Sequence, residues 1–117
     1  MLPGQPELRT ALDGESSAAP VFAALGDETR LRLVARLGAR GPLSTTRLTS
    51  GSAVTRQAIT KHLVILAGAG LVRDVRSGRE RLWELNRERV AEARVYLDQI
   101  AQQWDDALAQ LREFVEE

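Results

Sequence analysis

The feature that most constrains this chain is a seven-residue apolar repeat along its C-terminal part. One set of apolar positions recurs every seven residues, and a second set recurs at the same interval three places on: Val90, Leu97, Trp104 and Leu111, then Ala93, Ile100, Ala107 and Phe114. The pattern predicts one long helix from Arg87 to about Val115, capped by Asn86. Such a helix has little left to pack against in a domain of this size. We therefore expect its apolar seam to form a dimer interface, with a hairpin inside one chain as the weaker alternative.

A second helix is predicted between Thr55 and Gly70. Ile59, Leu63 and Leu66 recur at steps of four and three and form one buried stripe. Thr55 can act as N-cap, and glycines near the end can stop the helix. The side chains off the stripe can all hydrogen-bond a base edge or a phosphate: Arg56, Gln57, Thr60 and Lys61. Such a face suits the major groove of DNA, although an ordinary solvated face has the same composition.

The segments before this helix complete a helix-turn-helix pattern. We expect a short helix from Pro20 to Leu25, followed by a second helix from Glu28 to Leu37 that Asp27 caps and Gly38 ends. Its predicted core face consists of Leu31, Val34 and Leu37, with Leu33 beside them, and most of its arginines (Arg30, Arg32, Arg36 and Arg40) are expected to be solvated. Leu43 can pair briefly as a strand, and Ser44 can cap a short helix that ends near Leu48. A turn then leads into the helix that starts after Thr55.

The segment after Gly70 predicts a β-hairpin. Two stretches with strand-forming residues, Leu71–Arg76 and Arg79–Leu85, flank the turn pair Ser77-Gly78. Four arginines lie on it: Arg73, Arg76, Arg79 and Arg81. A basic hairpin directly after a helix-turn-helix is typical of the wing of a winged helix, placed to touch the DNA backbone or minor groove.

Composition limits the class of protein. The 117 residues, 44% of them hydrophobic, suit one domain from residue 18 to 117, preceded by a flexible arm of residues 1–17 rich in Pro and Gly. There are no cysteines, which excludes disulfides and thiolate metal sites. No apolar run approaches the roughly 20 residues that span a bilayer, and the N-terminus lacks a secretory pattern. We expect a cytoplasmic protein without a membrane partner.

Charge is unevenly distributed although the net charge is zero. Residues 55–81 hold six bases and two acids, a net of +4, whereas residues 84–117 hold four bases and nine acids, a net of −5. Acids beyond a Debye length of ~8–10 Å do little to oppose DNA binding at a basic face.

In order and spacing, four motifs resemble the ArsR-type winged helix-turn-helix repressors. They are Leu25-Gly-Asp-Glu-Thr-Arg-Leu-Arg-Leu33, Gln57-Ala-Ile-Thr-Lys-His-Leu63, Ala69-Gly-Leu-Val72 and Arg76-Ser-Gly-Arg79. The resemblance implies a mainly α fold with a small β-hairpin and a long C-terminal dimerisation helix. Many members sense metals, but residues 42–52 hold no cysteine and the C-terminal helix holds no histidine. The lone His62 cannot form a site of three or four ligands, so we expect it to have a structural or backbone-contact role. The chain therefore resembles the metal-free members.

The sequence therefore predicts a homodimeric repressor that binds a palindromic operator and needs no metal or other cofactor. A winged-helix protein-interaction module that does not bind DNA is the alternative, and any small-molecule effector is unknown. An enzyme is disfavoured, because there is no cysteine nucleophile and the one histidine has no nearby Ser-Asp constellation. The adjacent Asp105 and Asp106 do not form a facing acid pair, and no Gly-rich phosphate loop precedes a helix, so no catalytic residue is expected. The residues expected to bind DNA are Thr55, Arg56, Gln57, Thr60, Lys61, His62, Arg73, Arg76, Arg79 and Arg81. Those expected at the dimer interface are Phe22, Leu25, Val90, Leu97, Ile100, Trp104 and Leu111.

Overall fold

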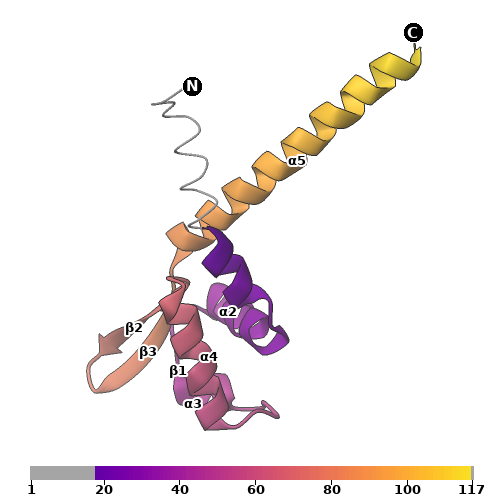
Figure 1. The fold of residues 1–117 in the computed structure, drawn as a ribbon. Coiled ribbons are helices and arrows are strands. Elements are labelled where there is room, and N and C mark those ends of the chain that lie inside the picture. The colour runs from indigo at the N-terminus through magenta and orange to yellow at the C-terminus, as the bar shows by residue number, and fades with distance from the viewer. Residues whose placement is uncertain (1–17, 117) are drawn as a thin grey trace, which may run out of the picture.

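The computed structural model describes residues 18–116, which form a mainly helical body with a small sheet and one projecting helix (Figure 1). The arm predicted for residues 1–17 lies outside the described residues. A helical segment over residues 18–25 precedes the labelled elements, which are α2 (Glu28–Arg40), β1 (Leu43–Ser44), α3 (Thr45–Thr49), α4 (Arg56–Gly68), β2 (Val72–Ser77), β3 (Glu80–Leu85) and α5 (Arg87–Glu116). The predicted fold class, mainly α with a small β element and a long C-terminal helix, is confirmed.

Four predicted helix caps are confirmed by hydrogen bonds from first-turn backbone N–H groups. Asp27 Oδ2 accepts from the Arg30 N–H at 2.9 Å, and Ser44 Oγ accepts from the Arg47 N–H at 3.1 Å. Thr55 Oγ1 accepts from the Ala58 N–H at 3.2 Å, and Asn86 Oδ1 accepts from the Arg89 N–H at 3.4 Å. Each bond satisfies a donor that the helix itself cannot pair, so these side chains define where the helices begin.

Helix α2 differs from the prediction in its end and in its buried face. It continues through Gly38 to Arg40 and ends at Gly41, whose φ of 81° is a left-handed value that glycine adopts without steric cost. Leu33 and Leu37 are buried, whereas Leu31 is 53% exposed. At ~100° per residue, Leu31 is turned ~120° away from Leu37 around the helix. The core therefore selects the stripe that contains Leu33, and the prediction for Leu31 is wrong.

The sheet is antiparallel, with strand order β1-β3-β2. Ser77 pairs with Glu80, so the hairpin turn is Gly78-Arg79, one residue later than predicted. Gly78 has a φ of 63°, which suits a turn with glycine at its first central position. The brief pairing predicted for Leu43 is confirmed, because Leu43 lies opposite Trp83. The Trp83 indole N–H also donates to Thr45 Oγ1 at 3.0 Å, which joins the sheet to α3.

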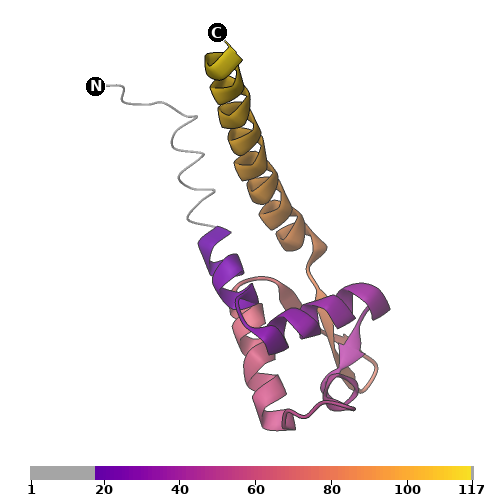
Figure 2. The same ribbon diagram turned by 90° about the vertical axis from the view of Figure 1, so that its right-hand side faces the viewer.

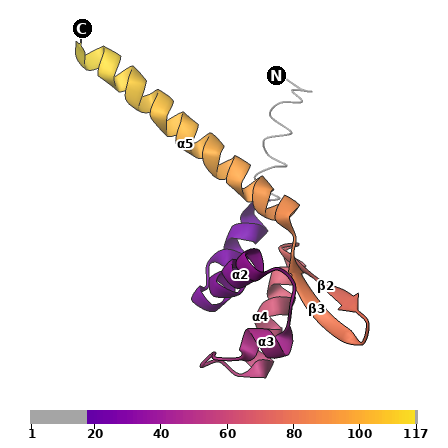
Figure 3. The same cartoon turned by 180° about the vertical axis from the view of Figure 1, so that it is seen from behind.

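Helix α5 leaves the body and extends away from it in all three views (Figures 1, 2 and 3). Thirty residues at ~1.5 Å each give a helix about 45 Å long. The radius of gyration is 19.2 Å, compared with about 13 Å for a compact chain of this length. Ala93 is buried, but every residue from Leu97 to Glu116 is exposed. Beyond its first turns, α5 has no packing partner among the described residues.

Candidate nucleic-acid interface

Helix α4 has one face built into the core. Ile59, Leu63 and Leu66 are each at most 1% exposed and pack in the same cluster as Leu33 and Leu37 of α2. This burial fixes the rotation of α4 about its own axis. The opposite face is therefore presented to solvent in a defined orientation.

The outer face of α4 carries the predicted DNA-contacting side chains. Arg56, Gln57, Thr60 and Lys61 are all exposed and together line a shallow depression of about 440 Å³. No ion pair joins Arg56 or Lys61 to another residue within 18–116. The Thr60 hydroxyl donates to the Arg56 carbonyl at 3.0 Å, so its oxygen remains as an acceptor. The face thus offers cationic donors, one amide and one hydroxyl acceptor.

The outer face continues to Val64, which sequence reasoning missed. Val64 lies four residues after Thr60 and is 59% exposed. The signal was present in the helical spacing, because residues four apart lie on one face.

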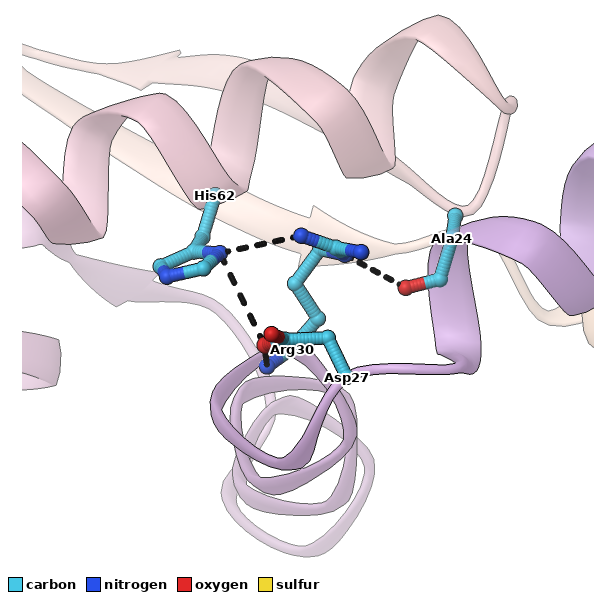
Figure 4. Close-up of polar contacts among 4 residues, drawn as sticks. All are labelled: Ala24, Asp27, Arg30 and His62. Atoms are coloured by element: carbon cyan, nitrogen blue, oxygen red, sulfur yellow. Dashed lines mark hydrogen bonds and ion pairs between the residues drawn. The ribbon is translucent and has the colours of Figure 1, made fainter.

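His62 belongs to a different face of α4 from the expected base-reading residues, where it makes contacts within the chain that fit a structural role; its DNA contact stays a prediction. Its side chain is 21% exposed and points toward the start of α2 (Figure 4). The Arg30 Nη1 lies 3.3 Å from His62 Nδ1. Because a guanidinium can only donate, Nδ1 accepts this bond. The Asp27 Oδ2 lies 3.8 Å from the same nitrogen. His62 therefore connects α4 to α2 within the body.

Arg30 links this cluster to the preceding helical segment, because its Nε donates to the Ala24 carbonyl at 2.6 Å (Figure 4). The backbone N–H of Arg30, donating to Asp27, lowers the pKa of that carboxyl below its ordinary value, and the nearby Arg30 charge adds to the effect. Arg36 connects α2 to α3, because its Nη1 donates to the Leu48 carbonyl at 2.9 Å and its Nη2 donates to the Arg47 carbonyl at 3.0 Å. The expectation that most arginines on α2 are merely solvated is wrong for these two, which hold the helices around α4 together.

The four arginines of the hairpin divide into two pairs. Arg81 forms an ion pair with Asp74 at 2.8 Å and lies over the Trp83 ring, 5.1 Å from its centroid. Arg73 lies 3.4 Å from Glu84. Both therefore have partners across the hairpin.

Arg76 and Arg79, which lie at or next to the hairpin turn, are exposed and have no ion pair with any residue from 18 to 116. The hairpin and the N-terminal end of α4 lie on the side of the body opposite to α5 (Figures 1 and 3). The free cations of the hairpin and the outer face of α4 can thus approach one extended polyanion together.

The predicted dimer-interface residues also fall into two groups. Phe22, Leu25 and Val90 are half-buried and pack against the chain's own core, and the Phe22 ring lies 5.8 Å from that of Tyr96. Val90 thus packs within the chain at the start of the seam, and its place at the dimer interface stays a prediction. The other group belongs to what we call the apolar stripe of α5: Leu97, Ile100, Trp104, Leu108, Leu111, Phe114 and Val115, which are 46 to 76% exposed. Leu108 and Val115, which are seven residues apart, widen the predicted seam by one position per heptad.

Residues 18–116 contain neither a cluster of metal ligands nor a membrane-spanning helix. No group of three or more His, Cys, Asp or Glu side chains in this part of the chain is arranged to hold a metal ion. No helix in the same residues has the length and hydropathy needed to cross a membrane.

Comparisons with known proteins agree with this geometry. Residues 25–75 match a helix-turn-helix domain family. The chain is 40% identical over 74 residues to the HTH-type transcriptional regulator YuzN of Bacillus subtilis, an alignment that covers 58% of this chain and 80% of YuzN. It is 39% identical over 85 residues to the HTH-type transcriptional regulator Rv2034 of Mycobacterium tuberculosis, covering 73% of this chain and 76% of the relative.

Solved structures give the same result. An ArsR-like transcriptional regulator from Rhodococcus sp. RHA1 superposes with a TM-score of 0.76 at 37% identity, covering 86% of this chain and 93% of the other. The homodimeric winged helix-turn-helix domain of Mb0332 from Mycobacterium bovis has the same fold, with a TM-score of 0.60 at 20% identity and coverage of 88% and 92%. The order of helices, the hairpin after α4 and these relatives lead to one conclusion. This chain belongs to the ArsR family of winged helix-turn-helix transcriptional regulators.

Proposed function

We propose that the protein is a homodimeric repressor that reads a palindromic operator with the outer face of α4. The observation that carries this proposal is the pairing of a solvent-exposed, acid-free polar face with a buried stripe on the same helix. The core holds the helix rigidly, while Arg56, Gln57 and Lys61 remain free to bond outward. Protein-interaction surfaces do not require such a concentration of unpaired donors, whereas the major groove does.

Base reading is assigned to the first turns of α4. Gln57 can pair with the N6 and N7 atoms of adenine, and Arg56 or Lys61 with O6 and N7 of guanine. Thr60, whose hydroxyl proton is directed to the backbone, would accept from a base amino group. Thr55 is occupied as a cap, so we assign it a role in orienting the helix end toward phosphate. Each good bidentate base contact contributes ~1–3 kcal/mol to discrimination.

The hairpin is proposed to act as a wing that contacts phosphate or the minor groove. The lack of ion-pair partners for Arg76 and Arg79 within residues 18–116 favours these two over Arg73 and Arg81, which are paired across the strands. The wing would then supply affinity that is independent of sequence and sensitive to salt.

Dimerisation is proposed to occur through the apolar stripe of α5. A long helix that exposes Leu97, Trp104 and Leu111 to water has an apolar surface of the kind that marks protein interfaces. A second copy of the chain carries the same stripe, which suits a two-fold symmetric, self-complementary contact. The two α4 helices of the dimer would then bind two half-sites whose centres are about 34 Å apart.

The proposed regulator does not sense a transition metal. The sequence contains no cysteine, and its one histidine lies beside a guanidinium that would repel a bound cation. The release of DNA would then depend on some other signal, or on none.

Selection of bound duplexes from a random pool, followed by gel-shift titration, tests this function. We expect an inverted repeat to be enriched and bound as a dimer. Gln57→Ala should relax the preference at one position of each half-site and leave binding to unrelated DNA nearly unchanged. If no sequence is enriched and no duplex is retarded, the protein-interaction module is the better description.

A further inference from the structure

An apolar side chain lies in the middle of the polar outer face of α4. Val64 is 59% exposed and follows Gln57 by seven residues, Thr60 by four and Lys61 by three. It therefore shares their side of the helix. The buried residues Ile59, Leu63 and Leu66 lie on the other side, so Val64 takes no part in the core.

Folding does not explain a valine at this position. A β-branched residue on the exposed face of a helix loses side-chain freedom and has lower helix propensity than lysine, glutamate or alanine. With 59% of its surface in water and no place in the core cluster, Val64 gains little from burial within the chain. A contact outside the chain would explain it.

We propose that Val64 contacts the 5-methyl group of a thymine in the operator, and so determines specificity at that base pair. The inference rests on the proposed function, because it requires the outer face of α4 to lie in the major groove. Among the groups that base pairs present there, the thymine methyl is the apolar one, and small apolar side chains contact it. The side chain is suited to such a contact because a helical valine strongly prefers one χ1 rotamer.

The geometry of α4 indicates where this thymine lies. Val64 is seven residues from Gln57, which is ~10 Å along the helix axis at ~1.5 Å per residue. With base pairs spaced by ~3.4 Å along the duplex axis, the thymine should lie at most about three base pairs from the pair that Gln57 reads, the full offset applying when α4 is parallel to that axis. Gly68 is the next residue on this face, and a Cβ added there would meet nothing within 4 Å. Because glycine has no side chain, residue 68 does not keep the duplex away from Val64.

Operators in which single thymines are replaced by deoxyuridine test the proposal, because deoxyuridine lacks only the methyl group. One replacement in each half-site should weaken binding by the wild-type dimer about fifteenfold, because two methyl contacts are lost and each buried methylene-sized group contributes a factor of about four. Val64→Ala should bind the thymine operator about as weakly as the wild-type protein binds the deoxyuridine operator. It should no longer distinguish the two. Gln57→Ala, the matched control on the same face, should retain the difference between thymine and deoxyuridine at this position.

Three results would overturn the assignment. The wild-type protein could be indifferent to every thymine replacement, or Val64→Ala could keep the full methyl preference. The third result is that Val64→Ala binds the operator unchanged but no longer binds a protein partner. Val64 would then belong to a protein-docking patch with its neighbour Ile65, which is 47% exposed. After any of these three results, an operator enriched from the random pool would still support the proposed function. Failure to enrich any operator would contradict both the proposed function and the Val64–thymine contact. Because Val64 is exposed, the alanine variant should melt no lower than the wild-type protein.

Discussion

Removing apolar side chains from α5 should dissociate the proposed dimer. Trp104 leaves 65% of its surface in water, which corresponds to ~160 Å² if a tryptophan presents ~250 Å². At ~25 cal/mol per Å², burying this area contributes about 4 kcal/mol per side chain. That value is an upper limit, because association also costs conformational and rigid-body entropy. A loss of only ~3 kcal/mol of binding free energy would still weaken the dimer more than 100-fold, since 1.4 kcal/mol is a factor of ten.

The variant to make is Trp104→Ala combined with Leu97→Ala. Sedimentation velocity over a concentration series should show a smaller species than the wild-type protein. Gel-shift titration should show much weaker operator binding, because a monomer contacts only one half-site. Far-UV circular dichroism should still show a folded body, because the core residues Leu33, Ile59 and Leu66 are untouched.

Val95→Ala is the matched control. Val95 is an apolar residue on the same helix, 55% exposed, and it lies two positions after the buried Ala93 and so on the side away from the stripe. Its truncation should leave the sedimentation coefficient and the operator affinity unchanged. A double variant that sediments like the wild-type protein would refute the reasoning, and the stripe would then pack within one chain.

The remaining predictions concern the wing, metals and pH. Arg79→Ala should weaken binding to all duplexes together and reduce the slope of log affinity against log salt by about 0.9 for each phosphate that the side chain neutralises. Arg94→Ala, a control on the exposed surface of α5, should leave that slope unchanged. An unchanged slope for Arg79→Ala as well would show that the wing does not contact DNA. Zinc, nickel or arsenite at modest excess should neither release operator DNA nor raise the melting temperature, and a tight stoichiometric titration would contradict this. Because the pKa of Asp27 is lowered in the folded state, its stabilising effect is present above the ordinary Asp pKa of about 4 and is lost as pH falls further. Asp27→Asn keeps a cap acceptor but cannot titrate. The free energy of unfolding of this variant, measured in urea, should therefore depend less steeply on pH below about 4 than that of the wild-type protein. Equal pH dependence in the two proteins would show that the Asp27 carboxylate does not cause the loss of stability.

Most element boundaries could be predicted from the sequence because their causes are local. A capping side chain such as Asp27, Ser44 or Thr55 acts within three residues of its own position, and its hydrogen bond forms whatever the rest of the chain does. Periodicity likewise identified the buried stripe of α4 and the repeat of α5. The outer face of α4 followed from the same spacing, because fixing one side of a helix fixes the other.

The tertiary structure decided which of several similar residues does which task. Leu31 and Leu33 were both available to the core, and the packing of α2 against α4 buried only Leu33. Arg79 has no ion-pair partner within residues 18–116, whereas Arg81 has one, because the strand register places Asp74 near Arg81. His62 points toward Arg30, which is thirty-two residues away in the chain. Propensity and periodicity depend on neighbours within a few residues, whereas ion pairs and core contacts depend on elements brought together by folding. A pattern of residue types therefore predicts elements and faces, but only the packed structure assigns partners to individual side chains.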